Sequence, residues 1–399
     1  MKSRNYIPTL LSLIFLVLAT ACNGSGLNKS GDFSSPVLEF LRYVPDNEIY
    51  REWIAYGDSS AWFSAWNIVR PESGDFRELE SPDFATPIAL SAVWQRQTYP
   101  PESLGFKWSA SEDQVSLLGF NALLLDRYME AGLPPESIAV AEFNFDRKQI
   151  GDALSKLGYK SDVMDGGTLY SIRGDHEMDI KSPIKSIQFA SLNRILLTDR
   201  KMIVGSATDV INNAQSAYTK ETPSLADNTT YIAISQALAD GSLGDYGKMV
   251  SVVLISGPTI NEQINRATQN LPASQSVDDF QHTLSAFDLA GFATFQSGKT
   301  SFLTLVLVFP KGGTNAQSAA DVVAERLENY TSIATKGNLG DIWSLEKTTG
   351  LKINDLPVAI IVMRSEADAV QSVEGNSLRV FTWSHLILRQ DILFLKTTP

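Results

Sequence analysis

The chain has 399 residues, of which 44% are hydrophobic and 20% are charged, with 33 lysines and arginines against 45 aspartates and glutamates. The resulting net charge of −12 argues against a nucleic-acid partner, because lysine and arginine neutralising phosphates supply most of that affinity. It argues equally against a basic surface for anionic lipids. The length and the apolar content favour two domains, each with its own core.

The first 22 residues have the three-part layout of an export signal. Lys2 and Arg4 make a basic start, residues 6–18 are apolar, and the small residues 19–21 precede Cys22. A membrane-spanning helix needs about 20 apolar residues, so this run is too short to be read as a transmembrane anchor. After Cys22 the sequence has no further apolar run long enough to span a bilayer.

The Ala-Thr-Ala-Cys ending of this segment resembles the lipobox of bacterial lipoproteins, although Ala19 stands where the lipobox more often has leucine. The resemblance implies that the Cys22 thiol receives a diacylglycerol and becomes the first mature residue. Cys22 is the only cysteine in the chain, so it cannot form an internal disulfide, and a free thiol outside the cell would be open to oxidation. The alternatives are an ordinary signal peptide that happens to be cleaved before a cysteine and an uncleaved anchor.

Residues 1–21 are therefore predicted to be a lipoprotein signal peptide, and residues 22–36, rich in glycine, serine and asparagine, a flexible tether. Loss of Lys2 and Arg4 leaves 31 basic against 45 acidic residues, a net charge of −14. The two or three acyl chains of a bacterial lipoprotein give stable attachment to a membrane. The predicted location is thus the extracytoplasmic side of a cell membrane, facing the periplasm or the cell surface.

Residues 37–225 are predicted to form an N-terminal helical segment followed by a first module of helices and strands. Within the helical segment, Asp58 or Ser59 can cap a helix that carries Trp62 and Trp66 on one face. The further elements predicted in this half are helices at 117–131, 148–157, 209–218 and 224–238, and strands at 138–145, 167–172, 184–190, 194–198 and 201–205.

Residues 226–399 are predicted to form a second module of the same kind, with the clearest hairpin of the chain turning at Ser297-Gly298-Lys299. Its predicted elements are strands at 249–256, 287–296, 301–309, 356–364, 378–383 and 386–396, and helices at 259–270 and 315–334. Both halves run strand, helix, paired strands, helix. This order predicts an α+β fold of two modules, each a largely antiparallel sheet with helices packed on one face.

The short motifs of the chain do not indicate a definite chemistry. Gly298-Lys299-Thr300 lacks the earlier glycine of a phosphate-binding loop and joins two predicted strands. Ser182-Pro-Ile-Lys185 lacks the widely spaced partner motifs of serine acyltransferases. His176, His282 and His385 are far apart, and none has a histidine or cysteine at zinc-binding spacing. The acidic segment around His176, residues 175–179, lacks the spacing of a calcium loop and is predicted to be a solvated loop. We predict no metal and no cofactor.

The densest aromatic cluster contains Trp53, Tyr56, Trp62 and Trp66. Aromatic faces can stack on sugars and other organic ligands, which makes Trp53, Trp62 and Trp66 the candidate ligand-binding residues. At helical spacing such residues more often form core, and that alternative is the favoured one. Asp58 beside them is predicted to cap a helix rather than to act as a catalytic acid.

The mature part resembles uncharacterised bacterial surface lipoproteins and no characterised family. The sequence therefore predicts a lipid-anchored envelope protein that acts through contacts with a protein partner or a ligand, and it favours a non-enzymatic role. One alternative is a solute-binding component with a ligand cleft between the two modules. Another is an envelope hydrolase whose site has no recognisable motif.

Overall fold

The computed structural model describes residues 35–81, 86–104, 112–182, 184–239, 244–269, 282–333, 336–366, 372–373, 377–378 and 382–397. The predicted signal peptide, Cys22 and the tether up to residue 34 lie outside the described residues. None of the helices within the described ranges is both long enough and apolar enough to cross a membrane.

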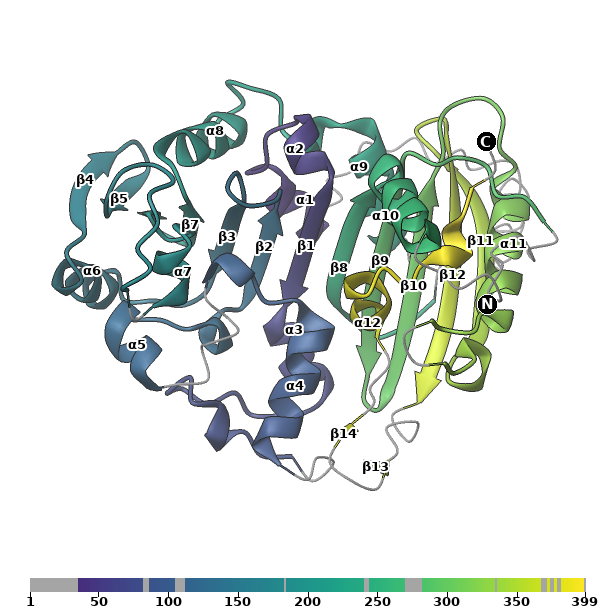
Figure 1. The fold of residues 1–399 in the computed structure, drawn as a ribbon, viewed down its shortest axis with the longest axis horizontal. Coiled ribbons are helices and arrows are strands. Elements are labelled where there is room, and N and C mark those ends of the chain that lie inside the picture. Colours follow the sequence, from purple (N-terminus) through teal and green to yellow (C-terminus); the bar gives the residue numbers. More distant parts are fainter. Residues whose placement is uncertain are drawn as a thin grey trace, which may run out of the picture. The chain divides into compact units, whose positions relative to one another are not determined.

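A twelve-stranded sheet runs through the described part of the chain, in the order β11-β12-β10-β9-β8-β1-β2-β3-β7-β6-β5-β4 (Figure 1). All of its neighbouring strands are antiparallel. The strands are β1 Trp53–Asp58, β2 Arg127–Ala131, β3 Ile138–Glu142, β4 Lys160–Met164, β5 Gly167–Ser171, β6 Arg194–Leu197, β7 Lys201–Gly205, β8 Lys248–Ser256, β9 Leu289–Ser297, β10 Thr300–Val308, β11 Ser344–Ile353 and β12 Leu356–Glu366. A separate ribbon pairs β13 Ser372–Val373 with β14 Ser377–Leu378.

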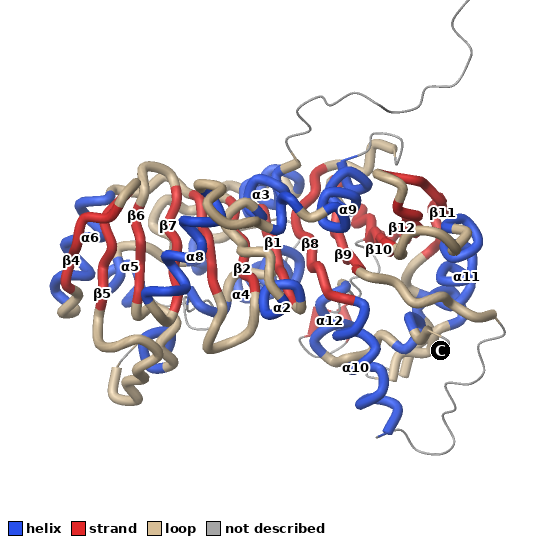
Figure 2. Tube along the Cα trace, turned by 90° about the horizontal axis from the view of Figure 1, so that it is seen from above, coloured by secondary structure: helices blue, strands red, loops and turns tan. Residues whose placement is uncertain are grey.

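Helices lie on both sides of the strands (Figure 2). They are α1 Pro36–Leu41, α2 Glu48–Arg51, α3 Ser59–Ala65, α4 Pro87–Thr98, α5 Glu112–Leu118, α6 Arg147–Lys156, α7 Lys185–Gln188, α8 Thr208–Tyr218, α9 Thr229–Ala239, α10 Gly257–Gln269, α11 Ala316–Asn329 and α12 Trp383–Leu388. The α+β class and the antiparallel sheet are therefore confirmed. The strands predicted for the two halves belong to one continuous sheet, because β1 pairs with β2 on one side and with β8 on the other.

The prediction that helices pack on one face is wrong. In β8, Val252 and Leu254 face one core, whereas Val253 and Ile255 face another. The first core extends across both halves of the chain under α1, α8 and α9. On the opposite face there are two cores, one built mainly from residues 62–204 and one mainly from residues 253–395. Residues 252–255 of β8 are all apolar because both faces of this strand are buried. The rule that apolar and polar residues alternate holds only for strands with one face exposed to solvent.

Four segments differ from their predicted type. The predicted N-terminal helical segment includes the strand β1, and the predicted helix at 117–131 includes the strand β2. Both segments are held as strands by pairing with other strands of the sheet. The predicted strand at 184–190 contains α7, and the predicted strand at 386–396 begins inside α12 and ends with a short 3-10 helix at Leu393–Leu395. In α12 the buried residues Trp383, Leu386 and Ile387 have the i, i+3, i+4 spacing of a helix face.

The ends of several helices follow from local side-chain chemistry. Asp58 caps α3, as predicted, and Asp146 and Asn315 cap α6 and α11 in the same way, each by accepting hydrogen bonds from first-turn amides. The hairpin of β9 and β10 turns at Gly298, whose φ of 56° suits a residue without a Cβ. Each of these signals is complete within a few residues of sequence.

Candidate functional site

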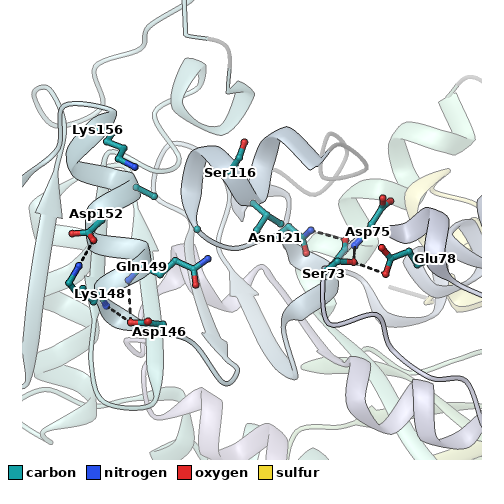
Figure 3. Close-up of a pocket in the computed structure, with 14 residues that line it drawn as sticks. Ser73, Asp75, Glu78, Ser116, Asn121, Asp146, Lys148, Gln149, Asp152 and Lys156 are labelled. Atoms are coloured by element: carbon teal, nitrogen blue, oxygen red, sulfur yellow. Dashed lines mark hydrogen bonds and ion pairs between the residues drawn. The ribbon is translucent and has the colours of Figure 1, made fainter.

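A polar pocket of about 780 Å³ lies between the loop around residues 73–78, the end of α5 and the helix α6 (Figure 3). Its lining consists mostly of charged and amide side chains with a few small residues. The lining residues are Ser73, Gly74, Asp75, Glu78, Val115, Ser116, Gly119, Asn121, Asp146, Lys148, Gln149, Asp152, Ala153 and Lys156.

One wall of the pocket is the polar face of α6. Ile150 and Leu154 of this helix are buried in the core, so the residues on its other face turn outward. Lys148, Asp152 and Lys156 follow one another at four-residue spacing, and the Lys148 Nζ atom lies 2.6 Å from Asp152 Oδ2. The wall is therefore positioned by ordinary helix amphipathicity.

The opposite wall is a loop fixed by the buried side chain of Asn121. Its amide nitrogen donates to the Gly74 carbonyl oxygen at 2.8 Å, and its Oδ1 atom accepts from the amides of Leu123 and Leu124. Gly74 has a φ of 71°, and a Cβ atom there would lie 2.6 Å from the Asn121 amide nitrogen. Only glycine suits this close approach.

The pocket is acidic, with Asp75, Glu78, Asp146 and Asp152 against Lys148 and Lys156. The hydrogen bond from Arg77 holds the pKa of Asp75 below its usual range. The hydrogen bond from Lys148 lowers the pKa of Asp152 in the same way. Both groups are thus carboxylates at neutral pH, and the lining contains neither histidine nor cysteine. Such a surface suits hydrogen bonding to a small polar molecule.

Within the residues that the structure describes, no group of three or more histidine, cysteine, aspartate or glutamate side chains is arranged to hold a metal ion.

The tryptophans singled out in the sequence lie in two places, neither of them in the pocket. Trp62 and Trp66 of α3 are 0% and 8% exposed and share one helix face, as predicted. Both indole nitrogens donate to Gln97 Oε1, at 2.6 and 3.3 Å. Trp53 of β1 is half-buried and packs against a different core. A ligand stacking on Trp62 or Trp66 would first have to displace the buried Gln97.

Asp58, between these tryptophans, caps α3 by accepting from the Ala61 amide at 2.7 Å. Burial raises its pKa, and its carboxylate is committed to the cap. The pocket itself was missed in the sequence. The Asp146 cap and the spacing of Lys148, Asp152 and Lys156 were visible there, but nothing in the sequence indicated that residues 73–78 lie opposite them.

No family model matches the chain, and no curated protein matches it. Among solved structures, crystal form I of TP0453 is similar with a TM-score of 0.35 and 7% identity, over 83% of this chain and 94% of that chain. Crystal form III of TP0453 gives a TM-score of 0.33 and 10% identity, over 84% of this chain and 96% of that chain. At these TM-scores the resemblance is distant.

Proposed function

We propose that the chain is a lipoprotein of the bacterial envelope, anchored by acyl chains on Cys22 and facing the extracytoplasmic side. The observation that carries the proposal is the N-terminal sequence, in which a short apolar run ends at small residues and at the one cysteine of the chain. The body that follows acts through contacts with a partner or a ligand. Its acidic surface suits a role outside the cytoplasm in which nucleic acid is not the partner.

The two halves, residues 37–225 and 226–399, are proposed to act as two modules of this body. The support is the pair of separate cores on one face of the sheet, each formed mainly by one half of the chain. The shared core on the other face joins them.

Substitution of Cys22 tests the anchor directly. In a bacterial host, the wild-type chain is expected to incorporate labelled palmitate and to enter the detergent phase on partitioning. Cys22→Ser is expected to lose the label completely and to move to the aqueous phase, because the thiol that receives the lipid is gone. Ser25→Ala in the neighbouring tether serves as the matched control. A Cys22→Ser chain that is processed and retained like the wild type would overturn the proposal.

A second candidate function is capture of a small polar solute, and the observation that favours it is the pocket beside α6. Its excess of carboxylates suits ligands that carry hydroxyl and amino groups, such as amino sugars. The pocket lies within residues 73–156, so the proposed ligand site belongs to the first half of the chain.

Glu78 provides a test of this second candidate. We expect glucosamine to raise the melting temperature of the detergent-solubilised protein more than glucose does. Glu78→Gln keeps an acceptor for Ser73 Oγ, 2.8 Å away, but removes one charge and should weaken glucosamine binding about 3- to 10-fold. Ser161→Ala, on the exposed strand β4, is the control. Equal affinity of the Glu78 variant and the wild type would exclude this pocket as the amine site.

A further inference from the structure

A second group of polar side chains lies at one end of the sheet, away from the pocket. Ser206 follows β7 and precedes α8, His176 lies in the loop after β5, and Glu136 lies between β2 and β3. Ser206 Oγ is 2.9 Å from His176 Nδ1, and His176 Nε2 is 3.9 Å from Glu136 Oε1. The three side chains thus follow one another as hydroxyl, imidazole and carboxylate.

The loop that carries His176 is exposed, as predicted for residues 175–179. It is also held in place by several hydrogen bonds. The His176 amide donates to the Ser206 carbonyl oxygen at 2.9 Å. Asp175 Oδ1 accepts from the Thr208 amide at 2.8 Å and lies 2.6 Å from Arg194 Nη2. Asn193 Nδ2 donates to the carbonyl oxygens of Gly174 and Glu177.

His176 has a φ of 58°, a left-handed conformation that costs a non-glycine residue of order 1 kcal/mol or more. The surrounding hydrogen bonds hold it there. This conformation brings both the backbone amide and the imidazole of His176 to Ser206. The loop thus places the imidazole next to a hydroxyl group.

The Ser206 hydroxyl donates to the Pro135 carbonyl oxygen and also lies against the His176 ring. Its Oγ atom lies 2.5 Å from the Pro135 carbonyl oxygen as well as 2.9 Å from His176 Nδ1. Glu136 lies on the Nε2 side of the ring, 3.9 Å away. A proton on Nε2 would leave Nδ1 free to accept the hydroxyl proton.

We propose that Ser206 is the nucleophile and His176 the general base of a site that hydrolyses carboxylic esters, with Glu136 as a positioning residue. Ser206 Oγ forms a bond to the ester carbonyl carbon while its proton passes to His176 Nδ1. The same proton then leaves with the alcohol as the ester C–O bond breaks, which gives an acyl-serine. In the second step water attacks the acyl carbon and gives a proton to His176 Nδ1. The bond between the acyl carbon and Oγ then breaks, Nδ1 returns the proton to Oγ, and the carboxylic acid leaves.

The first amides of α8 are the donors that the oxyanion of this reaction would need. Ala207 precedes the helix and has no side chain that can cap it. The amides of Asp209 and Val210 therefore find no acceptor inside their own helix or from its cap. They follow Ser206 by three and four residues, so they are the donors nearest to it in this helix.

The exposed side chains beside these residues indicate the class of acyl group. Leu133, Met178 and Ile180 are large apolar residues that are about half exposed or more. They lie within four residues of Glu136 or His176 along ordered loops, and Phe189 is brought close by the hydrogen bond from the Asp179 amide to Gln188. An apolar surface next to a nucleophile favours esters of acids with a hydrocarbon chain over short acyl esters.

The test uses the full chain in detergent with p-nitrophenyl acetate, butyrate and octanoate, and with a fluorophosphonate probe. The wild type is expected to prefer octanoate and to become labelled on Ser206. Ser206→Ala and His176→Gln should each reduce hydrolysis at least about 100-fold. Glu136→Gln should lower kcat with KM unchanged, which a merely structural role would not produce. Ser161→Ala, exposed on β4, is the control.

Hydrolysis by Ser206→Ala equal to that of the wild type would overturn the proposal. Because Ser206 is 4% exposed and also lies against Pro135, its variant can lose stability. If the Ser206→Ala chain is unstable, mass spectrometry of the wild-type chain treated with excess fluorophosphonate tests the site instead. A phosphonate adduct on Ser206 supports the proposal, and the absence of an adduct refutes it.

Discussion

Asp391→Ala is expected to lower the free energy of unfolding by about 3 kcal/mol or more, since each buried donor left unpaired costs about 1–3 kcal/mol. The Asp391 carboxylate is 1% exposed and accepts hydrogen bonds from Tyr330 Oη at 2.5 Å, Ser332 Oγ at 2.6 Å and the Ile333 amide at 3.1 Å. It thereby joins the segment after α12 to the chain that leaves α11. Urea unfolding followed by tryptophan fluorescence measures the loss.

Two variants make this measurement specific. Asp341→Ala changes an exposed aspartate in the same region and should stay within about 0.5 kcal/mol of the wild type. Asp391→Asn keeps one acceptor oxygen and should lie between the wild type and the alanine variant. If Asp391→Ala and Asp341→Ala were equally stable, the hydrogen bonds of the Asp391 carboxylate would not contribute to the stability of the fold.

Glu142→Ala is expected to destabilise the fold at neutral pH by about 2–3 kcal/mol, because it leaves the buried Lys201 and the half-buried Arg127 without their carboxylate partner. Arg127, Glu142 and Lys201 lie side by side on β2, β3 and β7. Glu142 Oε2 is 2.8 Å from Arg127 Nη2 and 2.6 Å from Lys201 Nζ, and Lys201 is buried. Glu39 of α1 completes the cluster from above the sheet.

The pH dependence of stability gives an independent measure of this cluster. Burial raises the pKa of Glu142, but hydrogen bonds from Arg127 and Lys201 outweigh it, so the pKa is lowered overall. The stabilisation is therefore fully present above the unfolded glutamate pKa, about 4.3, and is lost as the pH falls through the folded value.

Unfolding measured between pH 7 and pH 3 checks this dependence. Glu142→Gln should flatten the loss of stability below about pH 5 relative to the wild type. Glu39→Ala, at a more exposed position, should have a smaller effect than Glu142→Ala at neutral pH. An unchanged acid transition in Glu142→Gln would contradict the assigned role.

The sequence is sufficient to predict a structural element where its determinants lie within a few residues of one another. Asp146 caps α6 and Gly298 forms its hairpin turn through contacts within a few residues. It is insufficient for β1 and β2, which have the composition of short helices and are strands because of partners far along the chain. The predicted strand at 386–396 is instead the end of α12 and a 3-10 helix, whose apolar residues pack into one core. Its apolar content alone did not distinguish a strand from a helix.

The same distinction applies to the sites. One wall of the pocket follows from helical spacing in α6, and the other requires Asn121 to hold the loop at Gly74. Glu136, His176 and Ser206 are separated by 40 and 30 residues, and no spacing rule joins them. They meet because β2, β3, β5 and β7 end at the same edge of the sheet.

The central position of β1 has a consequence for how the protein is made. This strand is complete once residue 58 has been synthesised, yet its second neighbour, β8, begins at Lys248. Until β8 is made, the edge of β1 that will pair with it has unpaired backbone amides and carbonyls. These groups can pair with a strand of another chain, including a second copy that is still being synthesised. Chains shortened before residue 248 should therefore form intermolecular β-aggregates.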